Sequence, residues 1–225
     1  MAVNDKLTKT PYKTEKYTEQ QLVELAKCAN DPKYFMREFC YIQHPTKGRM
    51  KFELYDFQDD LVDCYHNNRY SIAMLARQMG KSTCAAGYLL WYAMFNPDQT
   101  ILIAAHKYSG ASEIMQRIRF AYETLPDFIR AGVTAYNKGS LEFDNGSRIV
   151  AQSTTENTGR GLSISLAYLD EFAFVRPNIA KEFWTSLSPP VSVSMYCAIS
   201  RNTLIWPWTV VLLCIHSATC FIPGI

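Results

Sequence analysis

The stretch MLARQMGKST, residues 74–83, constrains the fold more than any other part of this sequence. It follows the apolar run YSIAML (70–75), which predicts a buried strand, and it opens a segment (81–95) that predicts a helix. A tight glycine-containing loop between a strand and a helix directs backbone N–H groups and a helix N-terminus toward one point, which suits phosphate oxygens. The unit therefore indicates an α/β domain with a phosphate-binding loop.

Three consecutive residues give this loop its chemistry. Gly80 lets the backbone approach a ligand closely, Lys81 can neutralise the β- and γ-phosphates of a nucleotide, and the Ser82 hydroxyl can ligate Mg²⁺. The glycine that usually begins such a loop is missing, because Leu75 stands five places before Gly80. The tripeptide alone is a weak signal, and an ordinary strand–helix turn is the alternative.

A second motif, LAYLDE, closes another predicted strand (163–169) with two acids. Asp170 would stand at the carboxyl edge of the sheet, where ligands bind in open α/β folds, and it could serve Mg²⁺. Glu171 is next to it and could take a proton from an attacking water. Two solvated acids at a strand end are the alternative, but the loop and the acids follow one another in the order that nucleotide hydrolysis requires.

A loop arginine and an upstream aromatic–glutamine pair complete the candidate site. Arg77 could stabilise charge that develops on the γ-phosphate, and a salt bridge that anchors the loop is the alternative. Phe57 and Gln58 precede the first core strand, where a ring could stack on adenine and an amide could hydrogen-bond its edge. The alternative for Gln58 is a surface position on a helix.

Strands alternate with helices over most of the chain. We expect helices at 56–67, 109–124 and 177–187, a strand at 100–105, and a hairpin with Asn145-Gly146 at its turn. Thr18 with Gln21 and Asp31 with Pro32 predict two N-terminal helices, after a flexible basic arm (1–17) and before the basic connector HPTKGRMK. The alternation favours a mainly parallel, doubly wound sheet.

Longer strings resemble the ATPase domain of the large terminase of tailed phages, a DNA-packaging motor, in its T-even-like form. They are ARQMGKST, AAHKYSGASEIMQRI, LPDFIRAGVTAYNKGSLEFDNGSRI, TGRGLSISLAYLDEFAF and WTSLSPPVS, and the resemblance runs from about 33 to 192. This family carries Arg-Gln in its phosphate loop and lacks the first glycine. The resemblance implies a P-loop NTPase of the additional-strand, catalytic-glutamate type, with a mainly parallel sheet flanked by helices and a small helical N-terminal segment.

The resemblance also implies roles for individual residues. Glu171 and Arg77 would be catalytic, with Arg77 acting on the γ-phosphate in cis, and Gln58 would read adenine. Arg160 is a weaker candidate for contact with DNA or nucleotide, with a structural role as the alternative. Mg²⁺ would be held by Ser82 and Asp170. The loop residues expected to bind ATP are Gln78, Gly80, Lys81, Ser82 and Thr83.

Partners and location follow from the same resemblance. They are double-stranded DNA, a portal protein, the small terminase subunit and further copies of this chain on the portal. The place of action would be the host cytoplasm, transiently at the procapsid portal, without a membrane.

Length and charge limit the domain organisation. The chain has 225 residues, 48% of them hydrophobic, and its net charge of +2 excludes a strongly basic nucleic-acid coat. We expect an N-terminal arm and helical segment (1–50), an ATPase core (51–192) and an apolar tail (193–225). The tail could be truncated or out of frame, a divergent segment packed on the sheet, or, through its apolar stretch 204–222, a membrane anchor.

The sequence departs from the family after the second motif. A Ser/Thr-rich coupling motif that closes with Pro-Asn is expected, but the chain reads CAISRNT (197–203). The family's nuclease domain needs carboxylates for its metal ions, and no acid follows Glu182, so we expect no nuclease activity from this chain. Alternatives to a packaging motor are a helicase-like or repair DNA-dependent ATPase, and a non-catalytic truncated remnant that binds ATP without coupling it to DNA movement.

Overall fold

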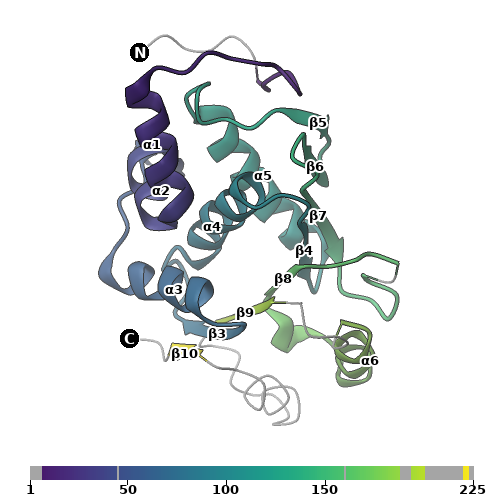
Figure 1. Ribbon diagram of the computed structural model, residues 1–225. Coiled ribbons are helices and arrows are strands. Elements are labelled where there is room, and N and C mark those ends of the chain that lie inside the picture. The colour runs from purple at the N-terminus through teal and green to yellow at the C-terminus, as the bar shows by residue number, and fades with distance from the viewer. Residues whose placement is uncertain (1–6, 45, 160, 188–193, 201–219, 223–225) are drawn as a thin grey trace.

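The computed structural model describes residues 7–44, 46–159, 161–187, 194–200 and 220–222. An eight-stranded sheet with strand order β10-β3-β9-β8-β4-β7-β6-β5 forms their centre (Figure 1). The strands from β10 to β7 in that order are parallel, and β6 and β5 continue the sheet antiparallel. The predicted mainly parallel α/β sheet is therefore confirmed. The strands are β3 (Tyr70–Leu75), β4 (Thr100–Ala105), β5 (Val133–Tyr136), β6 (Ser140–Phe143), β7 (Arg148–Ser153), β8 (Leu166–Asp170), β9 (Ser194–Ser200) and β10 (Cys220–Ile222).

Helices and a separate hairpin surround this sheet. α1 and α2 pack together at the N-terminal end of the molecule, far from α6 (Figure 1). α5 packs on β4 and β7, and α4 contacts α2, α3 and α5. The helices are α1 (Glu19–Asn30), α2 (Pro32–Phe39), α3 (Asp56–Asn67), α4 (Lys81–Phe95), α5 (Tyr108–Thr124) and α6 (Pro177–Leu187), with a short turn η1 (Phe172–Phe174) and a hairpin of β1 (Tyr41–His44) and β2 (Gly48–Lys51).

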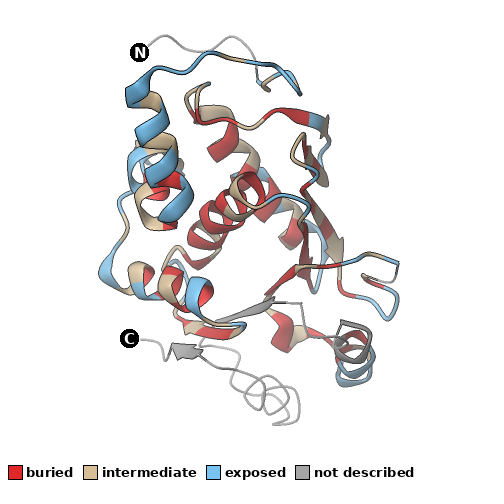
Figure 2. Ribbon diagram, in the orientation of Figure 1, coloured by how far each residue is buried: buried red, intermediate tan, exposed pale blue. Residues whose placement is uncertain are grey.

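Helix α4 is the centre of the core (Figure 2). Most of its residues are buried, which explains why its sequence carries apolar side chains on every face instead of one stripe. The Trp91 indole donates a hydrogen bond to the Cys28 carbonyl at 2.7 Å and ties α1 to α4. A helix that is packed on all sides keeps its N-terminus, and the loop that precedes it, in one place.

Local sequence signals set several element boundaries. Thr18 and Gln21 form the predicted capping box at the start of α1, and the Asp31 carboxylate accepts a backbone N–H at 2.8 Å at the start of α2. Between β6 and β7, Gly146 has a φ of +84°, which a residue without Cβ adopts at little cost. The predictions for the two helix starts and for this hairpin turn are confirmed.

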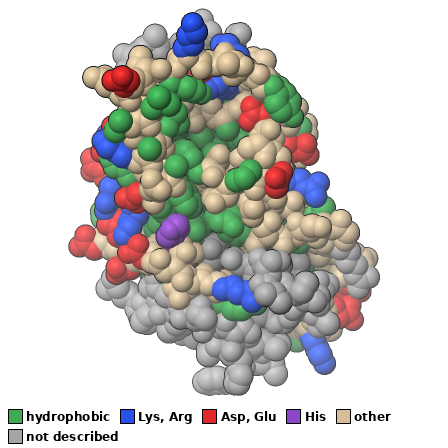
Figure 3. All heavy atoms as spheres, in the orientation of Figure 1, with side chains coloured by type: hydrophobic (Ala, Val, Ile, Leu, Met, Phe, Trp, Pro, Cys, Tyr) green, Lys and Arg blue, Asp and Glu red, His purple; other side chains and the backbone are tan. Residues whose placement is uncertain are grey.

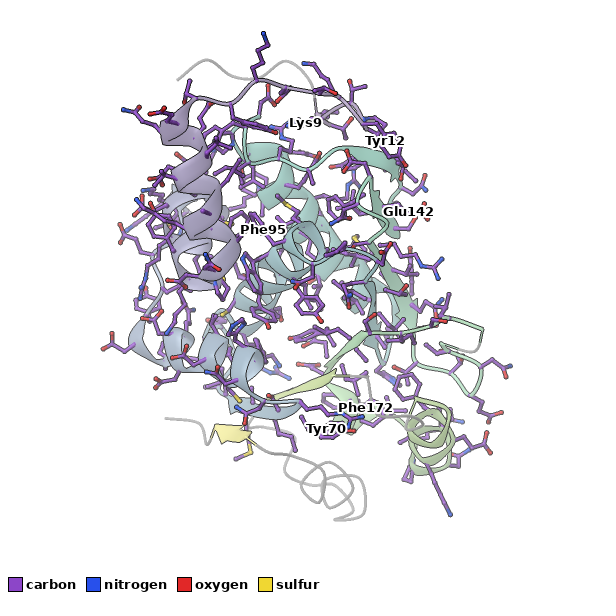
Figure 4. The ribbon with its side chains drawn as sticks, in the orientation of Figure 1. Lys9, Tyr12, Tyr70, Phe95, Glu142 and Phe172 are labelled. Carbon is purple, nitrogen blue, oxygen red and sulfur yellow. The ribbon has the colours of Figure 1, made fainter. Side chains whose placement is uncertain are left out.

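One prediction for the N-terminal segment is wrong, and a second is covered only in part by the described residues. The stretch predicted as a basic connector forms part of the β1–β2 hairpin, whose half-exposed and exposed side chains give no apolar alternation that would reveal a strand. The flexibility of the predicted arm (1–17) stays a prediction, and its residues 1–6 lie outside the described residues, but two of its described residues make backbone contacts. Val133 N donates to the Lys9 carbonyl at 3.1 Å, and Tyr12 N donates to Asp144 Oδ2 at 3.0 Å. Figure 4 labels Lys9 and Tyr12. The arm thus satisfies a backbone group of β5, the edge strand of the sheet.

Two strands come from the segment beyond 192. β9 lies between β3 and β8 and pairs in parallel with both, and β10 pairs with β3 at the edge of the sheet. An additional strand thus separates the loop strand from the strand that ends at Asp170. The boundary at 192 stays a prediction, and most of 204–222 lies outside the described residues, as does Arg160. Among the helices that the structure describes, none is long and apolar enough to cross a membrane.

Candidate nucleotide-binding site

The sheet brings the two sequence motifs to one edge. β3 and β8 are both parallel to β9, so the phosphate loop after β3 and the acids at the end of β8 lie at the same carboxyl edge. Lys81 bridges the space between them. Its Nζ lies 3.8 Å from Asp170 Oδ1 and 3.9 Å from Glu171 Oε1. The structure therefore brings together the three residues that the sequence predicts for phosphate, metal and water.

The Lys81 ammonium has hydrogen-bonding capacity left for a further anionic group. The residue is only 9% exposed, and its Nζ has no hydrogen-bond acceptor among the described residues. Both carboxylates lie beyond hydrogen-bonding distance, although an ammonium carries three donors. A buried charge without hydrogen bonds is costly, so phosphate oxygens beside Nζ would supply the missing acceptors. This unsatisfied group is a specific sign that the site fits a nucleotide phosphate.

The loop backbone has the conformation of an anion site. Gln78 has a φ of +64° and Gly80 a φ of +73°, both in the left-handed region. Left-handed residues within a turn point successive N–H groups toward a common centre, and α4 begins immediately afterwards. No acidic residue lies in the first turn of α4, so the positive end of its dipole is not neutralised. The non-glycine Gln78 in this conformation is strained, as functional loops often are.

Gln58 touches the loop directly. Its side chain is 3% exposed, its Nε2 donates to the Met79 carbonyl at 3.1 Å, and its Oε1 accepts from Tyr55 N at 3.2 Å. A Cβ on Gly80 would stand 2.6 Å from Gln58 Nε2, so the amide packs against the loop backbone. The sequence indicated Gln58 for the nucleotide site but missed this clamp on the loop. Its adenine-reading role stays a prediction.

Two aromatic rings lie beside Gln58. Tyr55 and Phe57 stack with ring centroids 5.7 Å apart and planes 10° from parallel, and Tyr55 is exposed. The sequence suggested Phe57 as a ring for adenine, but Phe57 packs partly against the core, so Tyr55 presents the open face. Alternation of aromatic and acidic residues in LYDFQDD was the signal available for Tyr55.

The two acids have different environments. Burial raises the pKa of Asp170, and the Lys81 charge opposes that rise. The Tyr168 hydroxyl donates to Asp170 Oδ1 at 3.4 Å and helps to orient it. Glu171 is more open, with 39% of its side chain exposed against 15% for Asp170, and its φ of +49° is strained for a residue with a Cβ. Asp170 is thus suited to a fixed ligand role and Glu171 to contact with water.

A cavity of about 330 Å³ lies beside these acids. Besides Asp170 and Glu171, its walls include His106 and Lys107, which directly follow β4 at the same sheet edge. The cavity gives water access to Glu171. Sequence reasoning did not name this histidine–lysine pair, although its position after a buried strand was the available signal.

The remaining predicted residues surround the loop. Arg77 is exposed and forms no ion pair with the carboxylates that the structure describes, so the loop-anchoring alternative has no support there. Ser82 and Thr83 lie in the first turn of α4, and Thr83 lines a second cavity of about 420 Å³ between α4, α5 and the β1–β2 hairpin. Within the described part of the chain there is no group of three or more His, Cys, Asp or Glu residues that could hold a metal. Mg²⁺ would therefore depend on Ser82, Asp170 and nucleotide oxygens, which is how this ion is often bound.

Comparison with known families agrees with this geometry. The family described as "Terminase large subunit, T4likevirus-type, N-terminal" matches residues 72–189, just over half of the chain. The chain belongs to this terminase family. The matched residues include the phosphate loop and the Asp170-Glu171 pair, so the family predicted from the sequence is confirmed.

Solved structures show the same fold. The large terminase of bacteriophage HK97 has a TM-score of 0.63 and 22% identity, over 76% of this chain and 37% of that one. A large terminase from a thermophilic bacteriophage, solved with ADP, has a TM-score of 0.57 and 10% identity, over 76% and 45%. The UvsW helicase of bacteriophage T4 has a TM-score of 0.58 and 13% identity, over 87% and 67%.

These likenesses confirm the predicted P-loop NTPase fold. The chain spans less than half the length of the two solved terminases, and at these identities the likeness shows the fold alone. The individual roles of the site residues stay predictions.

Proposed function

We propose that this chain is the ATP-hydrolysing motor domain of a viral terminase, which drives double-stranded DNA into a procapsid. The observation that supports it best is the unsatisfied Lys81 ammonium between Asp170 and Glu171, within a chain of the terminase family. A terminase solved with ADP shows that a nucleotide can occupy this fold. The site thus has the parts that phosphoryl transfer needs, namely charge for the phosphates, a metal ligand and a base.

The proposed hydrolysis depends on position and charge. Glu171, beside the open cavity, accepts the proton of the attacking water. Lys81 and Arg77 neutralise charge on the γ-phosphate, Arg77 from its exposed place in the loop. The loop and α4 N-terminus hold the phosphates through Gln78, Gly80, Ser82 and Thr83.

Ser82 and Asp170 would hold Mg²⁺, which when bound neutralises phosphate charge. The Tyr168 hydroxyl keeps the Asp170 carboxylate oriented toward that position. Burial raises the pKa of this carboxyl group, and the Lys81 charge beside it opposes that rise. Two protein ligands are enough for Mg²⁺, because this ion usually takes its other ligands from nucleotide phosphates and water.

The proposed partners are double-stranded DNA, a portal protein, the small terminase subunit and further copies of the chain, at the procapsid in the host cytoplasm. DNA contact would be mainly to phosphates, and hence sensitive to salt and tolerant of sequence. On the face shown in Figure 3, basic and acidic side chains are interspersed, so that face offers no single basic track.

Glu171→Gln tests the proposal. The variant should bind a fluorescent ADP analogue as wild type does, while single-turnover ATP hydrolysis falls by roughly 100-fold or more, because the proton acceptor is lost. Glu182→Gln, on the exposed face of α6, is the matched control and should keep the wild-type rate. Wild-type hydrolysis by Glu171→Gln would refute the role of Glu171.

A helicase-like ATPase is the second candidate, favoured by the likeness to the UvsW helicase over 87% of this chain. DNA-stimulated hydrolysis with strand separation would support it, whereas a packaging motor should hydrolyse ATP without separating strands. Nucleotide binding without any turnover in the wild-type chain would instead indicate a non-catalytic remnant.

A further inference from the structure

Two ion pairs fasten α3 to α2. Lys33 Nζ lies 2.7 Å from Asp63 Oδ1, and Arg37 pairs through Nη2 with Asp59 Oδ2. The two cations are four residues apart on α2, and the two acids are four residues apart on α3. Each set therefore lies on one helix face, one turn apart, and the pairs form a two-step ladder between antiparallel helices.

The two steps differ in what lies next to them. Asp59 directly follows Gln58, whose amide donates to the Met79 carbonyl of the phosphate loop. The backbone carbonyl of Gln58 also accepts from Cys84 Sγ of α4, at 3.8 Å. Asp63 lies one helical turn further from these contacts. Only the Arg37–Asp59 step is therefore adjacent to the clamp on the loop.

Asp59 depends on Arg37 for its charge compensation. Its Oδ2 accepts from the guanidinium, while Oδ1 is buried and has no hydrogen-bond partner among the described residues. Loss of the Asp59 charge would break the ion pair, and the first turn of α3 would then be held less firmly against α2. The simplest relaxation is a shift of that turn toward water, which would carry Gln58 with it.

We propose that the Arg37–Asp59 ion pair is a positioning device for the phosphate loop. It holds the first turn of α3 so that the Gln58 amide stays on Met79 and against Gly80, and the loop keeps its anion-binding shape. The N-terminal helices thereby set the affinity of the nucleotide site from outside it. This inference rests on the proposed function only in taking the bound anion to be a nucleotide phosphate.

The expected effect is on binding rather than on chemistry. The apparent dissociation constant equals the intrinsic constant divided by the fraction of time that the loop spends in its competent shape, so it rises when that fraction falls. We expect Asp59→Asn to raise the Kd for a fluorescent ADP analogue, and the KM for ATP, by roughly 3- to 10-fold. kcat should change little, because the residue touches neither substrate nor the acids. The ion pair is partly exposed, and Asp59→Asn leaves no unpaired buried carboxylate, so the unfolding midpoint should hardly move.

The experiment compares Asp59→Asn with Asp63→Asn in the full chain. Asp63→Asn removes the same kind of ion pair one turn further from the loop, and it should leave Kd and KM unchanged. Arg37→Lys should retain most of the affinity, because it keeps a positive charge beside Asp59. Gln58→Ala should raise Kd as Asp59→Asn does, and the double variant should add little beyond either single one.

A second readout is independent of nucleotide. Amide hydrogen exchange of the peptide 76–83, measured in the nucleotide-free protein, should be faster in Asp59→Asn than in wild type and unchanged in Asp63→Asn. Equal exchange and equal affinity in the two variants would overturn the inference. Faster exchange in Asp59→Asn, with a wild-type protein that binds no nucleotide, would uphold the positioning role and overturn the proposed function instead.

Discussion

Replacement of Gly80 by alanine should lower the free energy of unfolding through two separate effects. The first is conformational, because Gly80 has a φ of +73° and a ψ of +12°, and a residue with a Cβ loses about 1–2 kcal/mol in that region. The second comes from Gln58, whose Nε2 lies 2.6 Å from the position of the new Cβ. The amide must move away and lose its bond to the Met79 carbonyl, a loss of about 1 kcal/mol. The total is about 2–3 kcal/mol.

Gly48→Ala isolates the first contribution. Gly48 also has a left-handed φ, +69°, but nothing lies within 4 Å of the position of its Cβ. Urea unfolding should therefore show a loss of about 1–2 kcal/mol for Gly48→Ala and about 1 kcal/mol more for Gly80→Ala. In a Gln58→Ala background the excess should vanish, because the clash and the hydrogen bond are both absent. Equal losses at the two glycines, or an excess that survives in the Gln58→Ala background, would refute the clamp.

Three further outcomes are expected. Lys81→Met should weaken nucleotide binding and raise the pKa of Asp170 further in a carboxyl NMR titration, because burial raises that pKa and the Lys81 charge now opposes it. Arg130→Met should reduce the urea unfolding free energy by roughly 2–5 kcal/mol, since the buried guanidinium donates to two carbonyls at the end of α5; a loss below about 1 kcal/mol would contradict this. Burial raises the pKa of the Cys28 thiol from 9.0 to about 12. Between these pH values the Cys28 thiol ionises only in the unfolded chain, so the free energy of unfolding should fall as pH rises. Cys28→Ala should make the free energy of unfolding less dependent on pH in this range, and an unchanged pH dependence would refute the role of Cys28.

The strand–loop–helix unit could be predicted to the residue because local chemistry sets its borders. Gly80 allows the left-handed turn that ends the loop, and Asn96 before Pro97 ends α4. β3 and α4 accordingly have the predicted limits, 70–75 and 81–95. The β1–β2 hairpin could not be found in the same way, because its mostly exposed strands carry no apolar alternation.

The sequence could identify the residues of the site but not the distances between them. Lys81, Asp170 and Glu171 are recognisable from their neighbours in sequence, yet their separation depends on the order of strands in the sheet. Gln58 was recognisable as part of a nucleotide motif, but its contact with the loop depends on how α3 packs on α4. The ion pairs of α2 with α3 depend on helix pairing in the same way, and a sequence pattern does not specify that pairing.

The position of β9 has a consequence for the order in which the protein can be made. β9 is synthesised after β3 and β8, and yet it fills the place between them. While residues before 194 are still being added, β8 has one open backbone edge and β3 has two, because β10 also follows later, and an open edge is a template for pairing with another chain. The loop and the acids, which belong to those two strands, cannot reach their final spacing until this late strand has entered. Formation of the candidate site is therefore coupled to the entry of β9, and until then the open edges of β3 and β8 remain available for pairing with another chain.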